Sequence, residues 1–181
     1  MQVQVDTFTI SPGETNLHPE ALSKLEIEMI RSLVISILMF SGAAGCSSNK
    51  SPSIEFLNAG TVLPDGLPFS EAVRVDNTLY VSGMVGTKIG TLELVPGGIE
   101  AEARQTMDNI RLTLEAHGAS MDDIVKCTVM LADISEWGTF NEVYKTYFKN
   151  NRFPARSALG ANGLALNARV EVECIAVVGQ N

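Results

Sequence analysis

The sequence predicts an α+β domain in which two helices cover one face of a mixed β-sheet. Short β-prone segments alternate with two segments of helical periodicity, in the order strands, helix, strand, helix, strands. Helices on one side leave the other face of such a sheet to be buried in another way. We therefore expect a homo-oligomer whose sheets face inward.

The first part of the sheet is expected to be a hairpin. Residues 72–75 and 78–81 are rich in apolar and β-branched residues, and the Asp-Asn pair at 76–77 is a typical hairpin turn. Ser82-Gly83 is expected to end the second strand. The segment 92–95 (LELV) is expected to extend the sheet before a Pro-Gly-Gly sequence interrupts it.

The first helix is predicted over residues 99–117. Four apolar residues recur at spacings of four, three and four and form one stripe: Ala103, Met107, Ile110 and Leu114. Gly118 supplies the C-terminal stop. His117, at the end of this helix, is expected to be a solvated cation.

The second half of the domain is predicted to add a strand, a helix and two further strands. Asp122-Asp123 lead into a strand at 124–131, and Ser135 is expected to cap a helix that runs to about Lys149. The aromatic residues of this helix form a wide face that we assign to the core. Two extended segments, 157–159 and 169–178, complete the sheet.

The three cysteines, Cys46, Cys127 and Cys174, do not form a recognisable metal or disulfide pattern. Their number is odd, and no CxxC or Cys/His spacing is present. Cys127 and Cys174 lie in apolar runs and are expected to be separate, small core residues. The sequence predicts no metal site and requires no cofactor.

The charge balance argues against nucleic acid as a partner. The formal net charge is −8, and lysine and arginine do not cluster anywhere in the chain. A protein that binds nucleic acid through phosphate contacts needs such a cluster. An apolar fraction of 45% is sufficient for a packed core.

The first 46 residues are predicted to be an export signal of the lipoprotein type. Residues 33–40 (LVISILMF) form a short apolar run that follows Arg31 and precedes small residues at 41–48. The run is too short to span a bilayer as a stable helix. Ala43-Ala44-Gly45-Cys46 resembles a lipobox, in which the cysteine is lipidated and becomes the first mature residue.

This organisation predicts a signal at 1–46, a polar tether at 47–53 and a folded domain at 54–181. The acidic residues before Met29 fit no signal, so Met29 is the candidate translation start. The protein would then be periplasmic or anchored to a membrane by lipid on Cys46. The alternative is an N-terminal helix that stays with a cytoplasmic protein.

Two charged residues in apolar, strand-like surroundings are the candidates for chemistry. Arg156 directly precedes an extended segment, and Glu171 lies on the last strand. Alternation places Glu171 and Glu173 on one face of that strand and its apolar residues on the other. Because buried charges are costly unless paired, structural Arg156–Glu171 or Arg169–Glu173 ion pairs remain an alternative.

Four stretches of the sequence resemble the RidA (YjgF-like) deaminase family. Pro154-Ala155-Arg156-Ser157 is followed by Glu171 fifteen residues after the arginine, and 68–83, 122–137 and 140–148 agree in order and spacing. The resemblance covers residues 54–178. It implies a chorismate-mutase-like fold and a trimer with sites between subunits.

The resemblance also implies a reaction, in which a 2-imino acid is hydrolysed to a 2-keto acid and ammonia. Arg156 corresponds to the arginine that binds the substrate carboxylate, a role that suits its planar guanidinium. Glu171 corresponds to the glutamate that activates water, and Ser82 and Gly83 correspond to residues that line the pocket. Positioning and one proton acceptor suffice for this chemistry.

Several residues depart from the family pattern. Phe69 stands where many deaminases have tyrosine, Met84 where glutamine is common, and Ala158 where many have cysteine; residues 160–167 lack the usual Leu-Pro. These departures predict a less polar pocket around Phe69 and Ala158. A non-catalytic protein that binds a small carboxylate through Arg156 is the competing hypothesis.

Overall fold

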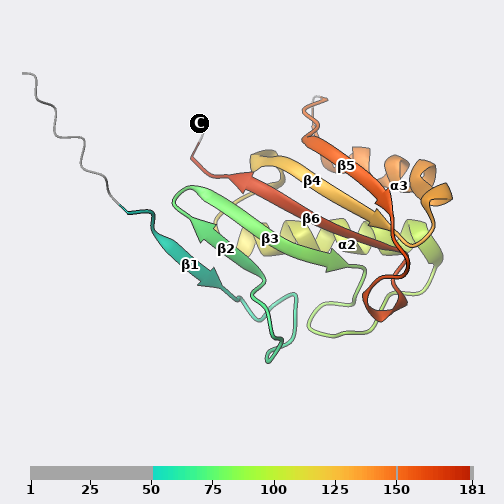
Figure 1. Cartoon of the computed structure of the whole chain (residues 1–181), viewed down its shortest axis with the longest axis horizontal. Coiled ribbons are helices and arrows are strands. Elements are labelled where there is room, and N and C mark those ends of the chain that lie inside the picture. Colours follow the sequence, from blue (N-terminus) through green and yellow to red (C-terminus); the bar gives the residue numbers. More distant parts are fainter. Residues whose placement is uncertain (1–50, 150, 180–181) are drawn as a thin grey trace, which may run out of the picture. The chain divides into compact units, whose positions relative to one another are not determined.

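The computed structural model describes residues 51–149 and 151–179, which form a six-stranded sheet with two α-helices (Figure 1). The strand order is β1-β2-β3-β6-β4-β5, in which only β4 and β5 pair in parallel. The strands are β1 (Ile54–Leu57), β2 (Ala72–Val75), β3 (Thr78–Val85), β4 (Ile124–Leu131), β5 (Ala155–Gly160) and β6 (Val170–Val177). The helices are α2 (Gly98–Ala116) and α3 (Trp137–Tyr144), both on the far side of the sheet in Figure 1.

The predicted α+β architecture is confirmed, and the differences lie at strand ends. The hairpin turns at Asp76-Asn77 as predicted, but β3 continues through Ser82-Gly83 to Val85, with a register shift between Val81 and Met84. The prediction of a strand at 92–95 is wrong, because only an isolated bridge joins Leu94 to Thr87. Strand β1 is not among the predicted strands, because its four residues form too short a run to indicate one.

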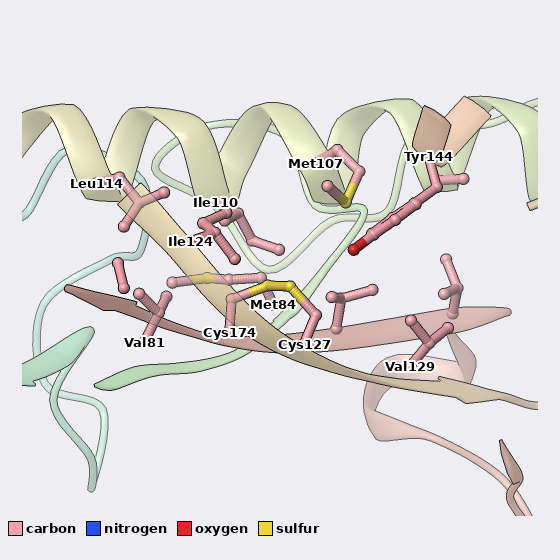
Figure 2. Packing of buried hydrophobic residues seen from close by; sticks show 14 of the residues in the cluster. Val81, Met84, Met107, Ile110, Leu114, Ile124, Cys127, Val129, Tyr144 and Cys174 are labelled. Carbon is pink, nitrogen blue, oxygen red and sulfur yellow. A yellow bond between two sulfur atoms is a disulfide. The ribbon is translucent and has the colours of Figure 1, made fainter. Parts of the chain in front are cut away.

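The core lies between the sheet and α2. The predicted stripe of α2 is fully buried against the helix-facing side chains of β3, β4 and β6 (Figure 2). A second row on the same helix is polar and buried, and it includes Thr106, Asn109 and Thr113. Asn109 donates two hydrogen bonds through Nδ2, to the carbonyls of Val85 (3.0 Å) and Thr87 (2.9 Å). This amide fixes the end of β3 against α2.

The second helix is shorter than predicted and begins differently. Ser135 does not cap this helix: Asp133 caps the preceding 3-10 turn, where its Oδ1 accepts from the Ser135 backbone N–H at 2.9 Å, and α3 itself has no side-chain cap. Short 3-10 turns precede and follow α3, so that the α-helix itself ends at Tyr144. Phe140 and Tyr144 are buried in the core, as predicted for the aromatic face.

Cys127 and Cys174 form a disulfide, which corrects the prediction of two separate core thiols. They lie directly opposite each other on the antiparallel strands β4 and β6, with Cα atoms 4.2 Å apart. Their separation of 47 residues in sequence hides this neighbourhood. Both residues are buried as expected, and Figure 2 shows the bond beneath α2.

His117 is buried, which contradicts the prediction of a solvated cation. Its Nε2 lies 3.5 Å from Oε2 of Glu71, and only 8% of the His117 side chain is exposed. The Glu71 carboxylate also accepts from the backbone N–H groups of Ala59 (2.9 Å) and Leu63 (3.2 Å). Glu71 therefore holds the connection between β1 and β2, which carries Phe69, against the end of α2.

The face of the sheet opposite the helices is uncovered. Its exposed or half-exposed apolar side chains include Phe56, Val73, Tyr80, Leu159 and Ile175, and Lys126, Glu171 and Glu173 lie among them. A monomeric protein seldom exposes this many large apolar side chains on one face. The predicted burial of this face in an oligomer is therefore consistent with the structure.

The predictions for residues 1–46, including Met29, the apolar run at 33–40 and Cys46, concern a segment outside the described residues. Residues 47–50 of the predicted tether also lie outside them, and Ser53 exchanges hydrogen bonds with Asp76. Within the described part of the chain, no helix combines the length and apolarity that a membrane span requires.

Candidate active site

Glu171 lies on the uncovered face of the sheet, near the start of the central strand β6. The alternation predicted for this strand is confirmed: Val170, Val172 and Cys174 are buried towards the helices, whereas Glu171 and Glu173 face the other way. Glu171 pairs in register with Val85 of β3 and Met130 of β4. The carboxylate is therefore held at a fixed position above the middle of the sheet.

Gly83 makes room for the Glu171 carboxylate. A Cβ at position 83 would overlap Oε1 of Glu171 and lie 3.0 Å from its Cδ. The irregular register of β3 brings Gly83 against this side chain. Ser82, the preceding residue, donates its hydroxyl to the Ser70 carbonyl at 2.7 Å. This bond fixes the residue next to Phe69 and directs the Ser82 hydroxyl away from solvent.

Burial raises the pKa of Glu171 above its usual value, and the negative charge of Glu173 raises the pKa further. A carboxylate whose pKa is raised is a stronger proton acceptor. A perturbed carboxyl group in a cavity is also typical of functional sites.

The cavity around Glu171 is lined mainly by apolar side chains and has a volume of about 300 Å³. Phe69, Leu92 and Leu166 form its rim and are 44–50% exposed. Thr87 lies at its floor and is 1% exposed; within the described chain, its hydroxyl has no hydrogen-bond partner. Glu171 is the one charged residue among those that line the cavity in this structure.

Arg156 lies on the edge strand β5, and its side chain is on the helix side of the sheet. Arg156 pairs with the buried Cys127 of β4, which fixes that side. The guanidinium donates to Oδ1 of Asn141 at 2.6 Å. It also lies over the rings of Trp137, Phe140 and Tyr144, with 4.6 Å from Cζ to the Tyr144 centroid. Aromatic faces attract cations, so α3 orients the guanidinium without neutralising it.

Neither predicted ion pair is present in the described chain. Arg169 pairs with Glu136, with one contact of 3.1 Å from Nε to Oε2, and Glu173 is exposed. Arg156 and Glu171 lie on opposite faces of the sheet and open into separate cavities. A single chain therefore does not bring the two candidate residues together.

The residues that depart from the family pattern do not all line the Glu171 cavity. Phe69 lines the Glu171 cavity and is half exposed. Ala158 lies on β5, two residues beyond Arg156 and on the same side, and is exposed. Met84 points into the core beneath α2 (Figure 2) and is 1% exposed, so it does not line the cavity. The inference that Met84 makes the pocket less polar is therefore wrong.

Sequence reasoning missed Asn141 and Thr87. Asn141 lies inside one of the stretches that carry the resemblance, but nothing in the sequence shows that it reaches Arg156 across fifteen residues. Thr87 follows β3 in a segment without a recognisable motif. For metal ions, the described residues contain no group of three or more His, Cys, Asp or Glu side chains that could form a site.

The family model described as Endoribonuclease L-PSP matches residues 64–178, which include Arg156, Glu171 and every described residue that lines the Glu171 cavity except Leu63. The chain belongs to the RidA (YjgF-like) family. A mouse RidA relative named 2-iminobutanoate/2-iminopropanoate deaminase is 47% identical over 112 residues, which are 62% of this chain and 82% of the relative. The human protein of the same name is 45% identical over 62% of this chain and 81% of its own length.

Solved structures of RidA proteins share the fold. RidA from an Antarctic Psychrobacter has a TM-score of 0.64 and 34% identity, covering 68% of this chain and 99% of that one. TdcF from E. coli, whose crystal structure contains bound serine, has a TM-score of 0.63 and 26% identity, covering 69% and 99%. The RidA similarity therefore extends over almost the whole of these proteins and over the described domain of this chain.

Proposed function

We propose that this protein is a hydrolytic deaminase that converts reactive 2-imino acids to 2-keto acids and ammonia. The proposal rests on the surroundings of Arg156 and Glu171. Neither Arg156 nor Glu171 has an ionic partner among the described residues, and each opens into a cavity. The names of the mouse and human relatives support the same activity.

In this mechanism, Arg156 holds the substrate carboxylate through two parallel hydrogen bonds. Glu171 accepts a proton from water as the water oxygen bonds to the C=N carbon. Glu171 passes this proton to the nitrogen, which gives a tetrahedral aminol with one OH and one NH2 group. Glu171 then accepts the hydroxyl proton and transfers it to the nitrogen. The C–N bond breaks, and ammonia leaves as the C=O bond forms. One water is consumed, and nothing is oxidised or reduced.

The proposal requires more than one copy of the chain, because Arg156 and Glu171 lie on opposite faces of one sheet. We propose a homotrimer in which Arg156 of one copy completes the Glu171 cavity of the next. Two features support it: β5 is an exposed edge strand, and the face that carries Glu171 exposes large apolar side chains such as Tyr80 and Leu159. Light scattering at micromolar concentration tests the assembly, and a stable monomer would contradict both the trimer and the shared site.

An imine-hydrolysis assay tests the chemistry. An amino-acid oxidase generates the imine in solution, and keto acid formation is measured against the spontaneous rate. Arg156→Ala should abolish both carboxylate binding and turnover. Glu171→Gln should reduce turnover by about 100-fold, a typical contribution of general base catalysis, and leave ligand binding intact. Arg152→Ala, which changes an exposed residue near Arg156, is the matched control and should remain active.

The competing hypothesis, a non-catalytic protein that binds small carboxylates, is favoured by one observation. The Arg156 cavity is complete without Glu171, since Asn141, Tyr144 and Phe153 line it within one chain. A wild-type protein that binds a 2-keto acid through Arg156, but does not exceed the spontaneous rate of hydrolysis, would establish the binder and exclude the deaminase.

We also propose that the domain acts after export, with Cys46 as a lipidated residue. The lipobox-like sequence at 43–46 supports this location, and so does the Cys127–Cys174 disulfide, because disulfides persist mainly in oxidising compartments. Expressed in a bacterium, the native protein should fractionate with membranes and lose the residues before Cys46, and Cys46→Ser should block this. Unprocessed protein in the cytoplasm would contradict the proposal.

A further inference from the structure

We infer that the cavity around Glu171 selects 2-imino acids with a branched or long apolar side chain over the smallest ones. The inference rests on the proposed deaminase function and adds the substrate class. It depends on the lining, the depth and the volume of this one cavity.

The lining of the cavity comes from three separate parts of the chain. Leu63, Leu67 and Phe69 belong to the connection between β1 and β2, Val85 and Leu92 come from the end of β3 and beyond, and Ala165 and Leu166 precede β6. These are seven apolar side chains around a single carboxylate. A substrate with only a methyl group would leave most of this apolar surface in contact with water, and a longer chain would cover it.

The depth of the cavity places the side chain relative to the chemistry. Phe69, Leu92 and Leu166 are close to half exposed at the rim, whereas Leu63 (9% exposed) and Thr87 (1% exposed) are buried at the inner end. Glu171, which would hold the water, is partly buried in the same cavity. With the imine carbon placed at Glu171, the side chain of the substrate would therefore lie between the apolar residues of the rim and those of the inner end.

Thr87 fixes the inner end of the cavity. Its N–H donates to the Val85 carbonyl (2.8 Å), and its own carbonyl accepts from Asn109 (2.9 Å). The inner end of the cavity is therefore built on backbone that is held against α2.

The volume sets the size of the occupant. Within one chain the cavity has about 300 Å³, at the lower end of ligand pockets, and Arg156 of the proposed second copy would take up part of it. The site therefore suits a molecule of amino-acid size better than a nucleotide or a large cofactor. Aliphatic, thioether or single-ring side chains are the class that fits both the volume and the lining.

The experiment compares the imine of leucine with the imine of alanine, each generated in solution by an amino-acid oxidase and followed with full-length protein. Extra methylene groups in an apolar pocket give roughly 10- to 200-fold discrimination, so kcat/KM should be at least about 10-fold higher for the leucine imine. Equal or better hydrolysis of the alanine imine would overturn the inference and leave the deaminase function standing. No hydrolysis of either imine would contradict the proposed function itself.

Two variants, one inside the cavity and one outside it, give the matched comparison. Ala165 is exposed at the cavity wall, and Ala165→Leu should fill the space and reduce the leucine-to-alanine ratio by at least about fivefold. Ala116→Leu, on an exposed position of α2 outside the cavity, should leave the ratio unchanged. If Ala165→Leu instead changes the oligomeric state and not the ratio, residues of a second copy occupy this cavity and the inference is overturned.

Discussion

Gly83 and Glu171 are in direct contact across β3 and β6, and the absence of a side chain at Gly83 is what gives the carboxylate its place. Gly83→Ala should therefore displace the Glu171 carboxylate. Because a displacement of about 1 Å at a reacting group can cost 100-fold in rate, we expect a loss of about that size in kcat/KM. Gly138→Ala is the control, since nothing lies within 4 Å of its added Cβ. A fully active Gly83→Ala protein would show that Glu171 tolerates movement.

The negative charge of Glu173 should be visible in the pH profile. Turnover requires ionised Glu171, so kcat/KM should fall as pH drops through the raised pKa of this residue. Glu173→Gln removes a like charge, lowers the pKa of Glu171 and should move the acid limb to lower pH. The profile is measured with one substrate across the acid range. An unmoved limb would mean that another group controls it.

The same titration should appear in stability. The pKa of Glu171 is raised above the value that the residue has in an unfolded chain, so between these two values the folded chain holds a proton that the unfolded chain has lost. Its contribution to the free energy of unfolding therefore decreases as pH rises through this window. Glu171→Gln lacks this decrease, so urea unfolding should show the variant gaining on the wild type from acid to neutral pH. A constant difference would contradict the raised pKa.

Asn141 should act on substrate binding through Arg156. Asn141→Ala removes the acceptor of the 2.6 Å hydrogen bond, and hydrogen bonds to charged groups contribute about 1.5–3 kcal/mol. We expect the KM for imine, and the Kd of a 2-keto acid, to rise about 10-fold or more while kcat changes little. Asn141→Asp should be worse, because its charge would pair with the guanidinium and compete with the substrate. Equal loss of kcat in Asn141→Ala would assign this residue to the chemical step instead.

The Cys127–Cys174 bond should contribute to stability without defining the fold. Removing a native disulfide typically costs about 2–4 kcal/mol, so the Cys127→Ala/Cys174→Ala protein should unfold at lower denaturant and keep its sheet. β4 and β6 remain paired through their backbones in either case. A reductant should lower the Tm of the wild type and have no effect on the variant. If both proteins respond alike, the thiols are reduced in solution.

The sequence predicted the elements that have regular periodicity and missed what depends on long-range contact. The stripe of α2 and the alternation around Glu171 were confirmed because both depend on local geometry. The sequence predicts a solvated His117, because no local pattern shows that the side chain of Glu71, 46 positions earlier, reaches it. The sequence also predicts that β3 ends at Gly83, because glycine usually interrupts a strand. In the structure, Gly83 instead makes room for the Glu171 carboxylate of β6.

The same difference between local pattern and long-range contact applies to the candidate site. Arg156 and Glu171 could be selected from their charge and surroundings, but their positions on opposite faces depend on the parallel pairing of β5 with β4. That pairing joins strands separated by α3, and no local pattern encodes it. Asn141 was missed for the same reason, since α3 is what brings it to Arg156.

The disulfide also closes a covalent ring that contains residues 127–174, and both Arg156 and Glu171 belong to this ring. A protease that cuts once between Cys127 and Cys174, for example at the exposed residues 151–153 before β5, would leave one connected molecule. The two ends could separate locally, but neither residue could be lost with a released fragment. Outside a cell, where nicked chains are not replaced by new synthesis, this linkage would keep both candidate residues in one molecule after a cut that would divide an unlinked chain in two.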